Sequence, residues 1–154
     1  MTNITTTTAE SLFLGIDLGG SHITAIILDE NSNIIDKVYL VINDRSVQSV
    51  LFLLATTCKE MLTKYTQIVS AGIAIPGNVD PFHGCTRYLP NFGWLDIVPV
   101  NSFLQEQANT DIFFSLRNDG RCAALAEYSL GVGKGSKVFS MLTLGTGMYQ
   151  FIVY

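Results

Sequence analysis

The sequence predicts an α/β fold with a mixed sheet, in the order βββαβαβα, followed by one further hairpin. Three observations predict it: short apolar runs that end at Gly, Pro or Asn, one long segment with helical spacing of apolar residues, and alternation of strand and helix patterns after that segment. With 154 residues, the chain has about the length of one ordinary domain and can bury a core.

The first third of the chain predicts a three-stranded meander. Residues 12–17 form an apolar run that stops at Gly19-Gly20, and a second strand pattern begins at His22 and reaches Leu28. A polar turn separates it from a third strand pattern at 34–42. Tight turns between consecutive strands make neighbours in a sheet, so we expect all three to pair.

A long amphipathic helix is predicted to follow and to cover the sheet. Ser46 can accept the N-cap hydrogen bond, and apolar residues then recur at three- and four-residue steps. The residues of this stripe are Val47, Val50, Leu51, Leu54, Cys58, Met61, Leu62 and Tyr65. A β-rich run at 68–75 comes next, and a long loop rich in Gly, Pro and Asn then extends to about Pro99.

The rest of the chain predicts a short helix, a strand, a helix and two strands. Their expected ranges are 101–108, 112–116, 118–130, 138–144 and 148–154. We expect three units along the chain: a disordered tail at 1–11, a domain at 12–130, and the start of a second unit at 131–154.

Composition narrows the classes of function. Charged residues are only 14% of the chain, and the net charge of −4 offers no basic field for nucleic acid or an anionic membrane. No stretch approaches the roughly 18 apolar residues of a membrane span. Cys58, Cys85 and Cys122 include no CxxC pair, which argues against a disulfide framework or a zinc site and favours a reducing cytoplasm.

The first glycine turn could bind phosphate. Asp17 ends a strand, and Gly19, Gly20 and Ser21 follow it. Glycine allows close approach of backbone N–H groups to phosphate, and the carboxylate can hold hydrated Mg²⁺. An ordinary glycine hairpin with a chance aspartate explains the same residues. The spacing is not GxGxxG and a strand follows, which disfavours a dinucleotide site.

Two further segments carry candidate chemistry. Asn118-Asp119 follows a strand pattern and starts a helix, where the helix dipole favours an ionised carboxylate that can act as a general base. Simple helix capping is the alternative, and it is the commoner role of an isolated Asn-Asp pair. Gly145, Thr146 and Gly147 form a second glycine turn with a hydroxyl for phosphate, or else a plain hairpin turn.

The long loop adds an amide and an indole. Asn91 can pair with sugar hydroxyls, and Trp94 could stack on a sugar, although core packing is the favoured role for this indole. His22 and His83 have no Cys or His neighbour at metal-ligand spacing, so surface or turn positions explain both.

The order of these motifs resembles the ROK family, which comprises repressors, open reading frames and sugar kinases. The motifs, in chain order, are Gly15-Ile16-Asp17-Leu18-Gly19-Gly20, Gly72-Ile73-Ala74-Ile75-Pro76-Gly77 with Val79-Asp80, Pro90-Asn91, Asn118-Asp119 with Ala123-Ala124-Leu125-Ala126-Glu127, and Leu144-Gly145-Thr146-Gly147. The resemblance extends from about Leu12 to Gly147, and the series is much more specific than any one motif.

The resemblance implies a ribonuclease H-like domain of the actin-like ATPase fold, followed by the first hairpin of an incomplete second lobe. It implies transfer of the γ-phosphoryl group of Mg-ATP to a hexose or N-acetylhexosamine, with Asp119 as the catalytic base. Residues 17–21, with Mg²⁺ at Asp17, and residues 145–147 would bind phosphate. The sugar would contact Gly77, Asn91, Asn118 and Asp119. Phosphoryl transfer demands mainly positioning and charge stabilisation, which suits these residues.

The sequence departs from the family pattern after the second glycine turn. Bulky residues at 148–151 replace a further glycine run, and Ser21-His22 is a milder change. The family's Glu-x-Gly-His motif, cysteine-rich zinc site and adenosine-binding part do not occur here, so we expect a truncated lobe.

A different class of function is an inactive sugar-binding module, or one that associates with a second copy or a complementing subunit through the apolar ribbon 138–154. A transcriptional regulator is disfavoured, because only a threonine-rich tail precedes Leu12 where such proteins carry a helix-turn-helix.

Overall fold

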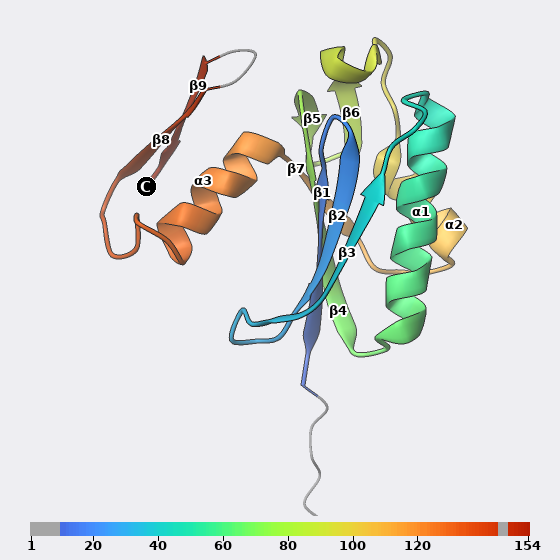
Figure 1. The fold of residues 1–154 in the computed structure, drawn as a ribbon, viewed down its shortest axis with the longest axis horizontal. Coiled ribbons are helices and arrows are strands. Elements are labelled where there is room, and N and C mark those ends of the chain that lie inside the picture. The colour runs from blue at the N-terminus through green and yellow to red at the C-terminus, as the bar shows by residue number, and fades with distance from the viewer. Residues whose placement is uncertain (1–9, 145–147) are drawn as a thin grey trace, which may run out of the picture.

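A five-stranded mixed sheet forms the centre of the molecule (Figure 1). The computed structural model describes residues 10–144 and 148–154. The strand order is β3-β2-β1-β4-β7. The pairs β1–β2 and β2–β3 are antiparallel, and the pairs β1–β4 and β4–β7 are parallel. This confirms the predicted meander and mixed sheet. The strands are β1 (Leu12–Leu18), β2 (His22–Leu28), β3 (Ile34–Val41), β4 (Ile68–Ile75) and β7 (Phe114–Asn118).

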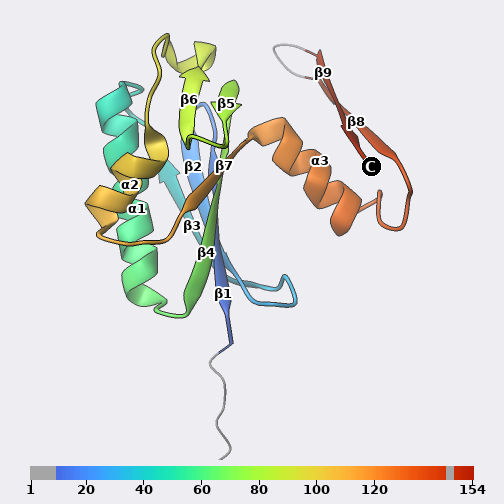
Figure 2. The ribbon, with the colours of Figure 1, turned by 180° about the vertical axis from the view of Figure 1, so that it is seen from behind.

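Two helices cover one face of this sheet. Helices α1 (Val47–Lys64) and α2 (Val100–Ala108) lie on the same side in Figures 1 and 2. Ser46 caps α1 as predicted, with its side chain accepting a hydrogen bond from the Ser49 N–H. The even-numbered residues of β1 are buried on this side, because successive strand side chains point to opposite faces. The opposite face of β1 therefore presents Gly15 and Asp17.

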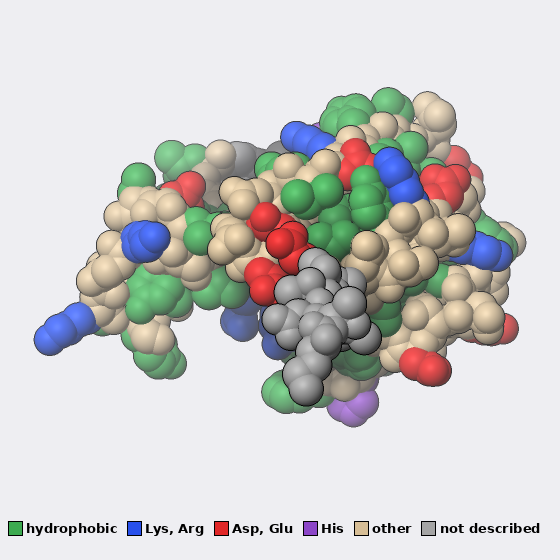
Figure 3. Space-filling view, turned by 90° about the horizontal axis from the view of Figure 1, so that it is seen from below, with side chains coloured by type: hydrophobic (Ala, Val, Ile, Leu, Met, Phe, Trp, Pro, Cys, Tyr) green, Lys and Arg blue, Asp and Glu red, His purple; other side chains and the backbone are tan. Residues whose placement is uncertain are grey.

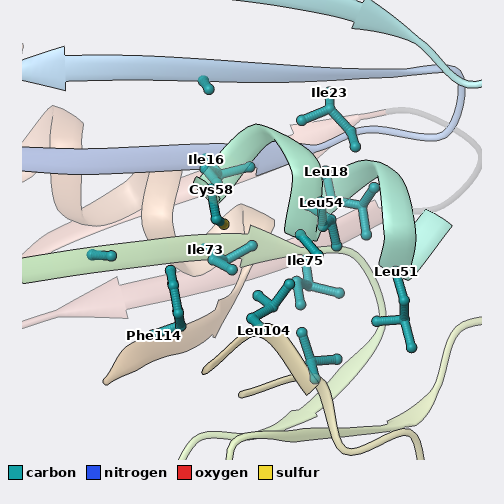
Figure 4. Close-up of a cluster of buried hydrophobic side chains, with 14 of the residues drawn as sticks. Ile16, Leu18, Ile23, Leu51, Leu54, Cys58, Ile73, Ile75, Leu104 and Phe114 are labelled. Atoms are coloured by element: carbon teal, nitrogen blue, oxygen red, sulfur yellow. The ribbon is translucent and has the colours of Figure 1, made fainter. Parts of the chain in front are cut away.

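The core lies between the sheet and these two helices. Figure 4 shows side chains from the strands interdigitating with those of α1 and α2. Cys58 is among them, and burial raises the pKa of its thiol to about 12. Trp94 is also buried and donates from Nε1 to the carbonyl oxygen of Arg45 at 2.9 Å, which confirms core packing for this indole. The largest fully buried side chains are Phe114, Leu18, Ile23, Ile27, Leu54, Ile73, Ile75, Leu89, Leu104, Leu116, Val50 and Val100.

The segment predicted as a long loop contains further structure. Strands β5 (Asn78–Asp80) and β6 (Cys85–Tyr88) pair as a hairpin, and a 3₁₀ turn, η1 (Pro90–Phe92), follows. These elements are too short for an apolar period to develop, so the sequence pattern did not reveal them. The Asp80 carboxylate supports the hairpin turn by accepting hydrogen bonds from the backbone N–H groups of Phe82 and His83.

The strand predicted at 112–116 instead spans 114–118. Ile112 lies outside the ladder because side chains satisfy its backbone: its N–H donates to Thr110 Oγ1, and its carbonyl oxygen accepts from Gln105 Nε2. The ladder with β4 starts at Phe114 and continues to Asn118. Asn118 is therefore both the last strand residue and the helix cap.

The C-terminal elements lie on the other side of the sheet from α1. Helix α3 (Asp119–Ser129) leads to a separate two-stranded sheet of β8 (Phe139–Leu144) and β9 (Met148–Val153), as Figures 1 and 2 show. The predicted turn residues Gly145, Thr146 and Gly147 lie outside the described residues. The division of the chain into units at residues 11 and 130 remains a prediction.

The surface is poor in charge, as the composition predicts. In Figure 3, Lys, Arg, Asp and Glu side chains are scattered among apolar and neutral ones. Within residues 10–144 and 148–154, no helix has the length and apolar character needed to cross a bilayer.

An ion pair that links β3 to α1 predicts a pH-dependent stability. Asp36 Oδ2 accepts hydrogen bonds of 2.8 Å from Lys64 Nζ and Tyr65 Oη, which lower the Asp36 pKa to about 2. Because the folded pKa lies below the unfolded value, this contribution is present above about pH 4 and is lost as pH falls towards 2. We expect Asp36→Asn to flatten the fall in Tm across that window. A Tm profile as steep as that of the wild type would contradict this role.

Candidate active site

A cleft of about 690 Å³ opens where the carboxyl ends of β4 and β7 meet the start of α3. We call it the main cleft. All four residues predicted to bind sugar line it: Gly77, Asn91, Asn118 and Asp119. They come from the end of β4, from η1, and from the junction of β7 and α3. Its volume is within the range of about 300–1,000 Å³ typical of small-molecule sites.

Asn118 fixes the geometry of the cleft floor. Its Oδ1 accepts from the Arg121 N–H at 3.2 Å, which caps α3. Its Nδ2 donates to the carbonyl oxygen of Gly77 at 3.0 Å, a link across 41 residues of sequence. The capping alternative for this residue is therefore correct, and the same amide also joins the two strand ends. One N–H and one lone pair of the amide remain for a ligand.

Gly77 has a backbone conformation that suits glycine. Its φ is 85°, and a Cβ atom at this position would overlap the carbonyl oxygen of Tyr88 in the β5–β6 hairpin. The missing side chain thus lets two backbone segments come close beside the cleft. Its carbonyl oxygen is held in place by Asn118.

Asp119 is the first residue of α3 and is exposed to solvent at the cleft. Its Oδ1 accepts from the Gly120 N–H at 2.8 Å, while no described side chain donates to its Oδ2. The carboxyl lies at the N-terminal end of the helix, where the helix dipole is positive. An ionised oxygen that faces a cleft can accept a proton from a bound hydroxyl group.

Asp17 lies beside the main cleft, on the sheet face that α1 leaves open. It lines a smaller hollow of about 350 Å³ together with Arg117 and Cys122. Partial burial raises the pKa of Asp17, the negative charge of Asp119 raises it further, and His22 opposes both. Asp17 and Asp119 therefore come close enough to interact electrostatically, although they are 102 residues apart.

The first glycine turn is exposed to solvent at Gly20 and Ser21. The Gly19 N–H donates to the carbonyl oxygen of His22 at 2.9 Å, so this part of the turn is an ordinary hairpin closure. A Cβ atom on Gly20 would meet nothing within 4 Å, and Ser21 Oγ lies 3.3 Å from His22 Nδ1. The second glycine turn, 145–147, is outside the described residues.

The carboxylate pair at the site is suited to a hydrated Mg²⁺ ion. Mg²⁺ in phosphoryl-transfer sites usually takes one or two protein carboxylates and completes its shell with phosphate and water. Asp17 and Asp119 supply that donor type; burial is the main cause of the raised pKa of Asp17, and the negative charge of Asp119, which a cation would offset, adds to it. Within the described residues, no group of three or more His, Cys, Asp or Glu could hold a metal by itself.

Sequence patterns missed several residues around the cleft. Asp80 accepts hydrogen bonds from Arg87 Nη2 at 2.7 Å and His83 Nδ1 at 2.9 Å, and these bonds, that from Arg87 foremost, lower the pKa of Asp80. This cluster braces the hairpin that borders the cleft. Tyr149 and Phe151 of β9 also line the cleft. The contacts of the Asp80 cluster depend on the pairing of separate elements, which no local pattern reveals, whereas the bulky residues at 148–151 were already visible in the sequence as a departure from the family pattern.

Comparison with known proteins identifies the family. The model of the ROK family matches residues 13–153, which is nearly the whole chain. The chain belongs to the ROK family. The matched range includes each glycine turn and the Asn118-Asp119 pair.

Relatives within the ROK family include named sugar kinases. A glucokinase from Thermotoga maritima is 32% identical over 138 residues, which is 88% of this chain and 42% of that protein. The crystal structure of a ROK family glucokinase from Streptomyces griseus in complex with glucose and AMPPNP superposes with a TM-score of 0.79 at 24% identity. The superposition covers 93% of this chain and 44% of that one. The fold is therefore that of the ROK sugar kinases, an actin-like ATPase fold.

The ROK fold is also shared by a regulator. The structure of a ROK family transcriptional regulator, a homologue of the E. coli MLC protein, superposes with a TM-score of 0.81 at 19% identity, covering 94% of this chain and 37% of that one. At such identity the likeness shows the fold alone. In all three comparisons this chain spans less than half the length of the relative.

Proposed function

We propose that this chain forms the sugar-binding and phosphate-binding half of an ATP-dependent kinase acting on a hexose or N-acetylhexosamine. The observation that carries the proposal is the meeting of Asp119, Asn118, Asn91 and Gly77 in one cleft, with Asp17 beside it. These residues come from well-separated parts of the sequence. Their convergence supports a common ligand better than separate capping and turn roles do.

Asp119 is proposed as the general base. Its exposed carboxylate lines the cleft at the start of a helix and can take the proton of an attacking sugar hydroxyl. Asn91 and Asn118 present amide groups to the same space and can orient the sugar by pairing with its other hydroxyls. Orientation matters because phosphoryl transfer depends on alignment of the attacking and leaving oxygens.

The phosphate side of the site is proposed at Asp17 to Ser21 and at Gly145 to Gly147. Asp17, with Asp119 near it, would hold Mg²⁺, and this ion supplies neutralisation of phosphate charge when it is bound. Gly20 leaves its backbone open to a ligand, because no neighbouring atom occupies the space where a side chain would lie. Ser21 is exposed at the same turn and can donate its hydroxyl to a phosphate oxygen.

A second candidate is an inactive module that binds sugar or a protein partner. The outer side of the β8–β9 hairpin favours it, since Leu142, Leu144, Met148 and Ile152 are all more than half exposed. An apolar ribbon of this kind is a typical surface for association with a second copy or a complementing subunit.

A coupled assay for ADP release separates the two candidates. The purified chain is incubated with Mg-ATP and a panel that includes glucose and N-acetylhexosamines. Sugar-dependent release supports the kinase proposal. Sugar binding without release supports the inactive module, and neither binding nor release with any sugar contradicts both sugar roles.

A further inference from the structure

Two aromatic side chains form one side of the main cleft. Tyr149 and Phe151 are alternate residues of β9 and therefore point to the same face of the hairpin. Both line the cleft that also contains Asn118 and Asp119. We call this pair the aromatic wall. It belongs to the segment where bulky residues replace the glycines that the family pattern leads one to expect.

Contacts with α3 hold the aromatic wall in place. The Phe151 ring lies against Gly120, so closely that a Cβ atom on this glycine would overlap the ring. Further along the hairpin, the ring of Phe139 packs against Tyr128 of the same helix with centroids 6.4 Å apart. The hairpin thus contacts α3 near both ends of the helix, at Gly120 and at Tyr128. Phe151 is consequently partly buried, whereas Tyr149 is 63% exposed and available to a ligand.

The main cleft is therefore chemically mixed. Asn91, Asn118 and Asp119 contribute amide and carboxylate groups to its lining, and the aromatic wall contributes apolar ring surfaces. A pyranose has matching faces, because its hydroxyl groups project from the rim while its axial C–H groups form an apolar patch. Aromatic side chains provide a large, rigid apolar surface of the kind that such a patch can cover.

We propose that Tyr149 and Phe151 bind the C–H face of a pyranose and make the cleft select sugars with the gluco configuration at C3 over their C3 epimers. In β-glucopyranose the hydrogens on C1, C3 and C5 form one continuous apolar face. Inversion at C3, as in allose, places a hydroxyl group in the middle of this face, where it would be pressed against the aromatic ring surfaces and lose hydration. This inference rests on the proposed sugar site and adds a determinant that the motif residues do not include.

Saturation-transfer NMR on the full chain tests the aromatic wall directly. With the wild type, irradiation of aromatic protons should transfer saturation to the C–H protons of glucose, and allose should bind more weakly. We expect Tyr149→Ala to weaken glucose binding roughly three- to tenfold and to narrow the difference between glucose and allose. Phe151→Leu keeps an apolar side chain against Gly120 and should weaken binding with little effect on Tm.

Tyr154→Ala is the matched control, because Tyr154 is 93% exposed and does not line the cleft. If Tyr149→Ala binds glucose as tightly as Tyr154→Ala does, or more tightly, the wall does not bind sugar and the inference is wrong. Asn118→Ala reports separately on the proposed function. If Asn118→Ala loses sugar binding while Tyr149→Ala binds glucose like the wild type, the result supports the proposed sugar site and contradicts only the role of the aromatic wall. Absence of glucose binding by the wild type would contradict the inference about the wall, and absence of binding by every sugar of the panel would contradict the proposed sugar site as well.

Discussion

Asp119→Asn should lower sugar-dependent ADP release by about 10²- to 10⁴-fold while leaving sugar affinity nearly unchanged. The neutral amide keeps the shape of the side chain and can still accept a hydrogen bond from the Gly120 N–H, so the start of α3 should remain intact. What it loses is the ability to take a proton from the attacking hydroxyl. Initial rates measured with the coupled assay, and sugar titrations with each protein, distinguish this loss from a loss of binding.

Asp96→Asn is the matched control for this substitution. Asp96 is also exposed, but it lies outside the main cleft. The Asp96→Asn substitution removes the same negative charge as Asp119→Asn does. Equal turnover by the wild type and Asp119→Asn would remove Asp119 from the proposed role. A parallel fall with Asp96→Asn would show that net charge, and not the position of the carboxylate, sets the rate.

Gly77→Ala should destabilise the fold by about 2–4 kcal/mol and distort the sugar side of the cleft. A side chain at this φ of 85° is strained, and its Cβ atom would also overlap the backbone oxygen of Tyr88. Relief of the overlap requires the β5–β6 hairpin to move away from the end of β4. This movement would disturb the hydrogen bond from Asn118 Nδ2 to Gly77. Urea unfolding measures the cost, and sugar titration measures the distortion.

Gly93→Ala separates the two causes. Gly93 has a similar φ of 72°, yet a Cβ atom there would meet nothing within 4 Å. The Gly93→Ala substitution should therefore lower the free energy of unfolding only by the conformational strain, roughly 1–2 kcal/mol. If Gly77→Ala costs no more than Gly93→Ala, the close approach of Tyr88 to Gly77 does not contribute to stability.

Local patterns predicted most of the main sheet and its covering helices. Alternation in β1 and the apolar stripe of α1 are strong signals, because each reflects a single buried face of one element. The caps at Ser46 and Asn118 were also readable, since a side-chain oxygen that binds the first turn acts over three residues. The predicted start of β7 was wrong because the side chains of Thr110 and Gln105 form hydrogen bonds with the backbone N–H and carbonyl groups of Ile112. The spacing of apolar residues carries no sign of these bonds.

The sequence predicted which residues belong to the candidate site but not how they are arranged in space. The motif order identified Asp17, Asn91, Asn118 and Asp119, and the structure places the last three in the main cleft with Asp17 in the adjoining hollow. The bulky residues that form the aromatic wall were visible as a departure from the family pattern, but their packing against α3 was not, because it exists only where β9 folds back on that helix. For the same reason the Asp80 cluster escaped the sequence analysis, as its role depends on the pairing of two very short strands.

The central claim is that Asp17 at the end of β1 and Asp119 at the start of α3 belong to one site. The most direct measurement is the carboxyl pKa of Asp17, followed by NMR titration in the wild type and in Asp119→Asn. We predict a wild-type value above the ordinary 3.8, and a fall towards that value in the variant, because the substitution removes one of the two causes that raise it and leaves burial in place. An Asp17 pKa that is the same in both proteins would contradict the account.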